Sequence, residues 1–328
     1  MKKFIIITSI NNLNKVMQKY ASLKGWKLVL VGDRKGPKKI NDDRIMFLDI
    51  DSQSKLGFNY CNYCPENHYS RKNIGYLYAM SLGADIIAES DDDNMPKNGW
   101  GEGIDFEVKD LKVFEKPKYF NVYREFSDKK IWPRGFPLEN VLGLHDKKYK
   151  RQKSKIGVWQ QLSDNSPDVD AIYRLTHDGP VTFKEGESFA LDKYVYCPFN
   201  SQNTFWVRDA FPLMYLPKSV TFRFTDILRG YIAQRLLWEN DLFLGFGGAT
   251  VWQDRNKHDL IQDFRDEIPM YVNSFNILNK LDTIQMKETM ADSLLYVYQF
   301  LLEGNIVKET ELDALKAWIK DIKTLGFA

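Results

Sequence analysis

Cysteine and histidine are scarce in this chain. Among 328 residues there are 3 cysteines and 4 histidines. An odd number of cysteines in a chain of this length argues against a disulfide framework. Cys61 and Cys64 form a C-x-x-C pair near His68, and with the distant Cys197 they leave a zinc site open as an alternative to ordinary thiols. One such pair is a weak signal, because structural zinc sites usually have four ligands in two pairs.

Long apolar runs and an excess of one charge are also missing. No stretch approaches the roughly 20 apolar residues that a membrane-spanning helix needs. Residues 1–12 hold an apolar run of strand length with no small-residue cleavage site after it, so we expect a strand and not a signal peptide. The 46 basic and 44 acidic residues leave a net charge of +2. With so small a net charge, no overall electrostatic field attracts the chain to nucleic acid or to an anionic membrane. We therefore expect a cytoplasmic protein without a membrane span.

The basic stretch at residues 147–155 is the local exception to this balance of charge. It has little aromatic interleaving, which favours a solvated loop over a nucleic-acid surface. The stretch permits a nucleic-acid partner without supporting one.

Strand and helix patterns alternate along the first hundred residues. At 44% hydrophobic and 14% aromatic residues, the chain can build a sizeable core. The alternation predicts an α/β fold, with a mostly parallel sheet flanked by helices and ligands bound beyond the carboxyl ends of the strands. The predicted strands lie at 3–8, 26–31, 45–50 and 84–88, the predicted helices at 11–23 and 70–82, and further helices at 226–239 and from 275 onward.

Three consecutive aspartates, Asp91, Asp92 and Asp93, follow directly on a buried strand pattern. Adjacent carboxylates repel one another, and their burial at the mouth of a sheet is costly unless a cation or hydrogen-bond donors compensate. Hard oxygen ligands of this kind suit Mg²⁺ or Mn²⁺, which keep coordination positions open for phosphates.

Arg71 and Lys72 follow Ser70, a predicted N-cap, at the start of the helix before the aspartates. Free amides and the positive end of the helix dipole favour an anion there, although a solvated helix start is the ordinary alternative. Thr8, Ser9 and Asp33 follow two strands at the same predicted edge of the sheet. Together with the aspartates, these residues predict a nucleotide-diphosphate site with a bridging cation.

Several segments resemble one family. They are YSRKNIGYLYA from Tyr69, ESDDDN from Glu89, PFNSQNT from Pro198, DILRGYIAQRLLWE from Asp226, and NKHD with DFRDEIP from Asn256 to Pro269. They are similar to the STELLO family of GT-A glycosyltransferases, over about residues 4–271. The segment PRGFP around Arg134 is more weakly similar to the reversibly glycosylated polypeptides, the UDP-arabinopyranose mutases.

The resemblance implies a GT-A fold of Rossmann type, a UDP-sugar donor and Mn²⁺ or Mg²⁺. It implies a catalytic domain over residues 1–272, with a nucleotide-binding half at 1–100 and an acceptor half at 101–272, and a helical extension at 273–328. Carried over by position, Asp91 and Asp93 form the D-x-D pair, with Asp93 on the metal and Asp91 nearer the ribose. Asp33 would contact the base or ribose, and Asp92, Thr8, Ser9, Arg71 and Lys72 would line the donor site.

A third metal ligand and the acceptor residues are less fixed by the resemblance. His258 is the candidate ligand, with Gln253 as a competing position and a surface histidine as the alternative. Asp226 begins a helix and suits a catalytic base, with a plain N-cap as the alternative. Contacts to sugar hydroxyls are expected from polar side chains at Asn200, Gln202, Asn203 and Arg229.

Arg134 matches the arginine that is glycosylated in the reversibly glycosylated polypeptides. Because a protonated guanidinium is a poor nucleophile, we expect it to contact phosphate or sugar instead.

The resulting hypothesis is a metal-dependent glycosyltransferase that moves a sugar from a UDP-sugar to a hydroxyl, for example on a glycan. Three alternatives stay open: a UDP-sugar mutase, a transferase that glycosylates a hydroxymethylated DNA base, and a non-catalytic scaffold of a polysaccharide synthase. The sugar, the acceptor and the stereochemical outcome are not specified by these motifs.

Overall fold

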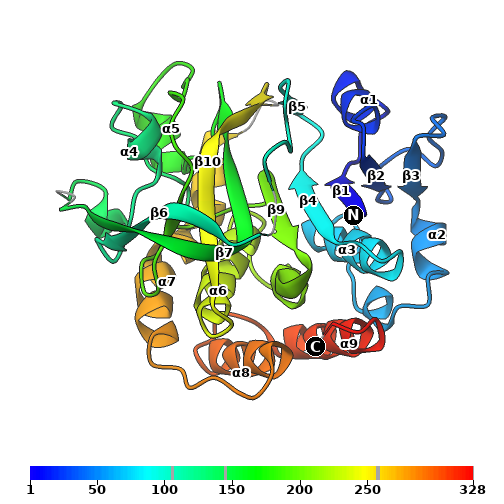
Figure 1. The fold of residues 1–328 in the computed structure, drawn as a ribbon. Helices are drawn as coiled ribbons and strands as arrows, with labels where there is room; N and C mark the ends of the chain where they lie inside the picture. Colours follow the sequence, from blue (N-terminus) through cyan, green and yellow to red (C-terminus); the bar gives the residue numbers. More distant parts are fainter. Residues whose placement is uncertain (105–106, 144–145, 256–258, 328) are drawn as a thin grey trace.

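A single mixed sheet crosses the molecule. The structure is a computed structural model that describes residues 1–104, 107–143, 146–255 and 259–327. Within these ranges ten strands join in the order β3-β2-β1-β4-β9-β7-β6-β8-β10-β5, with helices against the sheet and at its lower end (Figure 1). The predicted α/β fold class, with a C-terminal helical extension, is confirmed.

The first four strands of the chain pair in parallel, as the sequence predicts. β1 pairs with β2 and β4, and β2 pairs with β3. Their bounds are Lys3–Thr8 for β1, Trp26–Val31 for β2, Ile45–Leu48 for β3 and Ile86–Ser90 for β4. Because the carboxyl ends of parallel strands meet at one edge, the residues that follow β1, β2 and β4 converge there.

Two apolar layers enclose this parallel part. On one face Ile6 packs in the cluster that contains Ile74 of α3 (Lys72–Ser81). On the other face Ile5 packs in the cluster that contains Met17 of α1 (Lys15–Ala21). Strands buried on both faces are near-continuous apolar runs, which is why the sequence pattern predicts them.

Antiparallel pairs extend the sheet beyond β4. β9 pairs antiparallel with β4 and with β7, while β7 also pairs in parallel with β10. The bounds are Asn94–Pro96 for β5, Lys109–Lys116 for β6, Lys148–Asp164 for β7, Phe189–Leu191 for β8, Asn203–Val207 for β9 and Leu242–Gln253 for β10.

The prediction of a loop at residues 147–155 is wrong, because residues from 148 onward form the first half of β7. Its basic side chains meet acidic ones from elsewhere in the fold. Lys150 lies 2.6 Å from Asp192, and Lys155 lies 2.5 Å from Asp209. These ion pairs compensate a charge pattern that is otherwise unusual in a strand.

The helix predicted at 226–239 is α6 (Thr225–Trp238), but it is not amphipathic: all of its side chains are buried. Shorter helical segments connect the larger elements. They are α2 (Ile50–Ser54), η1 (Asn59–Asn62), η2 (Tyr69–Arg71), α4 (Tyr123–Phe126), η3 (Leu138–Asn140), α5 (Ala171–Thr176) and η4 (Arg208–Met214).

Three C-terminal helices, α7 (Leu260–Leu281), α8 (Met290–Glu303) and α9 (Glu309–Thr324), lie below both parts of the sheet (Figure 1). Asp321 of α9 accepts hydrogen bonds from the backbone amides of Asn59 and Tyr60, which fixes the extension to the nucleotide-binding half expected from the motifs. The boundary predicted at 272/273 falls inside α7, and the division into domains stays a prediction. Among the described helices, none combines the length and the hydropathy that crossing a bilayer requires.

Candidate active site

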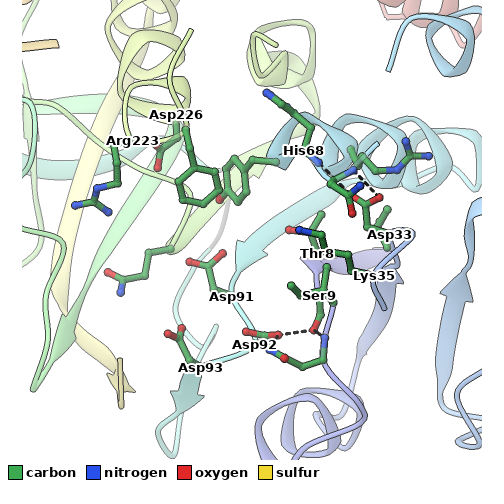
Figure 2. A pocket seen from close by; sticks show the side chains of 18 of the residues that line it. Thr8, Ser9, Asp33, Lys35, His68, Asp91, Asp92, Asp93, Arg223 and Asp226 are labelled. Atoms are coloured by element: carbon green, nitrogen blue, oxygen red, sulfur yellow. Dashed lines mark hydrogen bonds between the residues drawn. The ribbon is translucent and has the colours of Figure 1, made fainter. Parts of the chain in front are cut away.

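A cavity of about 500 Å³ opens at the carboxyl ends of β1, β2 and β4. Figure 2 shows the side chains that converge on it from the two parts of the sheet. Eleven of the residues singled out in the sequence for a glycosyltransferase site line it: Thr8, Ser9, Asp33, Arg71, Asp91, Asp92, Asp93, Arg134, Gln202, Asp226 and Gln253. The predicted edge of the sheet is therefore the edge at which the structure forms its cavity.

The three aspartates divide into two groups. Asp92 turns toward β1, where its carboxylate accepts hydrogen bonds from Ser9 Oγ and, at 2.9 Å, from Asn11 Nδ2 (Figure 2). Asp91 and Asp93 lie on the opposite side of the turn and line the cavity (Figure 2). All three aspartates line the cavity, but the carboxylate of the middle one is engaged in anchoring the turn to β1.

Both outer carboxylates are costly to ionise. Burial raises the pKa of Asp91 to about 6, against the opposing effect of the Lys72 ammonium. Burial also raises the pKa of Asp93, and the charge of Asp92 adds to this shift. Gln253 Nε2 partly compensates Asp93, because it lies 3.2 Å from each carboxylate oxygen.

These two carboxylates fit a Mg²⁺ or Mn²⁺ ion that shares its coordination with a ligand. Such ions are usually held by one or two carboxylates together with substrate phosphates. Across the described ranges no cluster of three or more His, Cys, Asp or Glu is placed to hold a metal by itself. His258, the predicted third ligand, lies outside the described residues.

Asp33 lines the same cavity at the end of β2. Its carboxylate accepts hydrogen bonds from the backbone amides of Asn67, at 2.8 Å, and of His68, at 3.0 Å (Figure 2). These bonds hold the loop before α3 against the end of the strand. The carboxylate is thus fixed in the cavity wall, where the predicted contact to a base or ribose stays a prediction.

Lys72 is completely buried and does not line the cavity. Its ammonium donates to Asp91 Oδ1 at 3.1 Å, to the carbonyl oxygen of Ser90 at 2.9 Å and to the hydroxyl of Tyr69 at 3.1 Å. Burial opposes its charge, but the Asp91 carboxylate keeps the pKa of Lys72 above its ordinary value. Lys72 therefore supports Asp91 from behind, and it does not face the space in which a diphosphate would lie.

Arg71 lines the cavity, but its guanidinium is engaged in hydrogen bonds with neighbouring residues. It donates to Gln53 Oε1 at 2.6 Å and to the carbonyl oxygen of Pro65 at 3.0 Å. The predicted N-cap at Ser70 is wrong, because η2 precedes α3 and His68 Nδ1 accepts from the amide of Ser70.

Arg134 forms the opposite wall with two carboxylates. Its Nε and Nη2 donate to Asp168 at 2.8 Å, and its Nη1 and Nη2 donate to Asp226 at 3.0 Å. Nη1 also donates to the carbonyl oxygen of Arg223, so all five N–H groups have acceptors. Burial opposes the charge, yet the Asp168 and Asp226 carboxylates hold the pKa of Arg134 well above its ordinary range.

Asp226 and Asp168 therefore share the guanidinium of Arg134, which holds both carboxylates in the cavity wall. Asp226 lies in the first turn of α6, whose N-cap is Phe224, so the N-cap alternative for Asp226 is not what the structure shows. Although burial acts in the opposite direction, Arg134 and Arg223 lower the pKa of Asp168 to about 2. The two guanidinium groups thus favour the ionised form of Asp168.

The predicted sugar-contacting residues divide between the cavity and its support. Gln202 lines the cavity and donates to Gln253 Oε1 at 2.7 Å, which extends the chain of polar contacts to Asp93. Asn200 lies behind the cavity and donates to Asp168 at 2.8 Å. Asn203 lies in the core, where it accepts from Trp100 Nε1 at 2.9 Å.

Arg229 also lies away from the cavity. Its guanidinium pairs at 2.5 Å with the buried carboxylate of Glu89, two residues before Asp91 in the chain. Glu89 also accepts from Trp206 Nε1 at 2.8 Å. This buried ion pair joins α6 to β4, and neither of its two side chains lines the cavity.

The three cysteines do not gather around a metal. Burial raises the pKa of Cys61 and of Cys64 to about 11. Cys197 is completely buried, and burial raises the pKa of its thiol further. Within the described residues, the geometry favours ordinary thiols over the zinc alternative.

Asp168, Arg223 and Arg255 line the cavity but carry no sequence signal that singles them out. Asp168 is one of three aspartates in the segment 164–170, and only its pairing with the distant Arg134 distinguishes it.

Comparison with known proteins agrees with the motifs. A family model described as STELLO glycosyltransferases matches residues 223–328. Two curated proteins of Arabidopsis thaliana, "Probable glycosyltransferase STELLO1" and "Probable glycosyltransferase STELLO2", are 28% and 27% identical over 349 aligned residues. Each match covers 99% of this chain and 45% of the relative, so the chain spans less than half the length of these relatives.

Among solved structures, glucosyl-3-phosphoglycerate synthase from Mycobacterium tuberculosis, in complex with phosphoglyceric acid, matches 86% of this chain and 80% of its own. Its sequence identity is 11% and its TM-score is 0.37, and we draw no conclusion from a similarity this small. The two curated relatives and the family model confirm the resemblance predicted from the motifs: the chain is similar to the STELLO glycosyltransferases.

Proposed function

We propose that the chain is a metal-dependent glycosyltransferase that uses a nucleotide sugar, in the first instance a UDP-sugar, as its donor. The observation that carries the proposal is the acidic turn after β4, where Asp91 and Asp93 line a cavity that Asp33 closes from the end of β2. A nucleotide at Asp33 would extend its diphosphate toward the two carboxylates. The glycosyltransferase descriptions of the relatives support the same chemistry.

In this proposal Asp91 and Asp93 hold the cation, which neutralises the charge that develops on the leaving diphosphate. Lys72 keeps Asp91 in position from inside the protein, and Asp92 keeps the turn attached to β1. The cost of ionising Asp91 and Asp93 without a cation is the cost that metal binding would offset.

Asp226 is the proposed base that accepts the proton of the acceptor hydroxyl in an inverting displacement. Arg134 is the proposed positioning residue, because its donors are all taken by Asp168, Asp226 and the Arg223 carbonyl oxygen. Asp168 supplies a second fixed negative charge, which suits the positive charge that develops on the sugar ring in a glycosyl transfer.

The test is incubation of the purified protein with Mn²⁺ and a panel of nucleotide sugars, with release of the free nucleotide as the readout. We expect release from at least one UDP-sugar, and its loss in Asp93→Asn and Asp226→Asn. Asp43→Asn is the matched control, because Asp43 is exposed and has no ion pair among the described residues. The proposal fails if no donor is bound or turned over, or if Asp93→Asn behaves like Asp43→Asn.

The alternative functions gain no specific support. In a mutase of the reversibly glycosylated type Arg134 would have to act as a nucleophile, and its guanidinium is saturated by two carboxylates. The basic stretch at residues 147–155 left a DNA acceptor open as an alternative. Its side chains in β7 form ion pairs with acidic residues; Arg151, for example, lies 2.7 Å from Glu187. Turnover of any donor in the assay above would exclude the scaffold alternative. The cytoplasmic location stays a prediction.

A further inference from the structure

A second cavity, of about 350 Å³, adjoins the first. Arg255 lines both cavities, and Asp168 of the first lies between Pro167 and Val169 of the second. The second cavity is further lined by residues 165–167, the end of α5, the loop at 177–181, Asp254 and Leu260. A molecule bound there would lie beside the wall that carries Asp168, Arg134 and Asp226, on the side away from Asp33.

Arg174 of α5 gives the second cavity its character. Its guanidinium donates to Ser166 Oγ at 3.1 Å and to the carbonyl oxygen of Pro167 at 2.6 Å, and neither partner is charged. Its Nε is buried without an acceptor, and the described part of the chain offers the guanidinium no ion-pair partner within 4.0 Å. One N–H on each Nη of Arg174 is therefore left for a ligand, whereas the buried Nε is not accessible from the cavity.

The charged groups near Arg174 compensate it only in part, because Asp168 and Asp263, which favour its charged form, are themselves paired with other arginines. Asp178 and Asp254 line the cavity but are exposed to solvent, which screens them. Arg223 is engaged by Glu267 at 2.7 Å, and Arg255 lies 2.9 Å from Asp263. Burial lowers the pKa of Arg174, the Asp168 carboxylate opposes this shift, and the charge of Arg223 adds to it. The cavity therefore holds a positive charge at a cost that an anion would remove.

Tyr173 and His177 complete the wall of this cavity. Their rings stack with centroids 4.4 Å apart and planes 2° from parallel, and His177 is exposed. Trp132 meets Tyr173 edge-to-face from the core, which fixes the stack in place. A rigid wall of this kind, next to one guanidinium, suits a small ligand with an apolar or sugar face and a single anionic group.

We propose that the second cavity binds the anionic end of the acceptor, a phosphate or carboxylate group that pairs with Arg174, while the acceptor hydroxyl reaches past Arg255 into the first cavity, where Asp226 lies. The inference rests on the proposed function, and it adds the chemical class of the second substrate. In the transfer, a bond forms between the acceptor oxygen and the anomeric carbon, the bond from that carbon to the diphosphate breaks, and the acceptor proton passes to Asp226. The nucleoside diphosphate leaves on the other side, toward Asp91 and Asp93.

The binding test uses inorganic phosphate as the probe, titrated calorimetrically into the full chain with saturating UDP and Mg²⁺ already present. Because UDP then fills the donor cavity, phosphate reports on the second one. We expect wild-type protein to bind phosphate and Arg174→Gln to bind it at least tenfold more weakly, with UDP affinity unchanged. Arg174→Lys should recover part of the loss, and Arg265→Gln, at an exposed arginine of α7, should bind like wild type. Absence of phosphate binding in wild type, or equal binding by Arg174→Gln, overturns the inference.

The kinetic test compares three acceptor classes at a fixed donor concentration: sugar phosphates, hydroxycarboxylic acids and neutral sugars. We expect the anionic classes to be used at least tenfold better, and Arg174→Gln to raise the KM for them while donor hydrolysis by water is unchanged. The better of the two anionic classes identifies the group. Equal use of neutral sugars would contradict the inference and leave the proposed function intact. A protein that binds no UDP-sugar but still binds phosphate through Arg174 would contradict the proposed function instead.

Discussion

The substitution Asp93→Asn separates the stability of the acidic turn from its function. Without a divalent cation, we expect this variant to be more stable than wild type at pH 7.5. The amide keeps an acceptor for Gln253 Nε2, and it removes a charge that raises the pKa of Asp91. Removing one of several neighbouring carboxylate charges stabilises the folded state, because the repulsion between those carboxylates is reduced.

The magnitude follows from Asp91. Its pKa of about 6 in the fold stands against an ordinary value of 3.8, and a shift of about two units corresponds to about 3 kcal/mol. The side chain of Asp91 is 31% exposed, so solvent screening reduces this to about 1–2 kcal/mol. Since Asp93 is one of several causes of that shift, we expect Asp93→Asn to gain on the order of 1 kcal/mol.

The sign of the pH dependence can be stated in advance. A carboxyl with a raised pKa binds its proton more tightly in the fold than in the unfolded chain. The stability that it contributes is complete below about pH 4 and is lost as the pH rises through about 6. The advantage of Asp93→Asn over wild type should therefore grow between pH 4 and pH 7.5.

The assay is urea unfolding followed by tryptophan fluorescence, with and without Mn²⁺ and UDP. Saturating ligand should stabilise wild type, by about 2.7 kcal/mol at a concentration 100 times the Kd, and should leave Asp93→Asn almost unchanged. The order of the two proteins should therefore reverse when ligand is added. A variant that is less stable than wild type in the absence of metal, or that gains as much from Mn²⁺ and UDP as wild type, would refute this reasoning.

Three further predictions concern residues that support the site and the packing of the C-terminal helices. Lys72→Met should lower the free energy of unfolding by about 3 kcal/mol at pH 7.5 and by less at pH 5, where Asp91 takes up a proton, as urea titrations at both pH values can check. Gly135→Ala should lower stability by about 2 kcal/mol or more, measured as a fall in Tm, because Gly135 has φ +86° and an added Cβ would collide with Ile227. Glu311→Ala should cost about 3 kcal/mol in urea unfolding, because the hydroxyl of Tyr215 and the amides of the 218–219 segment lose their buried acceptor. An unchanged stability in any of these variants would contradict the contact on which that prediction rests.

The parallel part of the sheet could be predicted because each of its strands is a local pattern. Apolar runs mark β1, β2 and β4, and the polar residues after them had to converge at one edge. The donor side of the candidate site, from Asp33 to Asp93, follows from that rule with no knowledge of tertiary contacts.

The acceptor side could not be predicted in this way, because its chemistry depends on pairs far apart in the chain. Arg134 and Asp226 are 92 positions apart, and Arg229 and Glu89 are 140 apart. The sequence predicts Arg134 at phosphate or sugar, whereas its N–H groups are taken by two carboxylates and the Arg223 carbonyl oxygen, which no local pattern indicates. β7 was missed for the same reason, since its lysines fit a strand only when Glu115 and Asp192 lie opposite.

The central claim is that Asp91 and Asp93 hold a divalent cation against a nucleotide diphosphate. Electron paramagnetic resonance of Mn²⁺ tests it directly, since the spectrum distinguishes the hydrated ion from an ion bound to protein and nucleotide. With wild-type protein, addition of UDP should convert the spectrum of the hydrated ion into that of a bound ion, and an Asp91→Asn, Asp93→Asn double variant should not. A spectrum that UDP leaves unchanged in wild type, or that it changes equally in the double variant, would contradict the account.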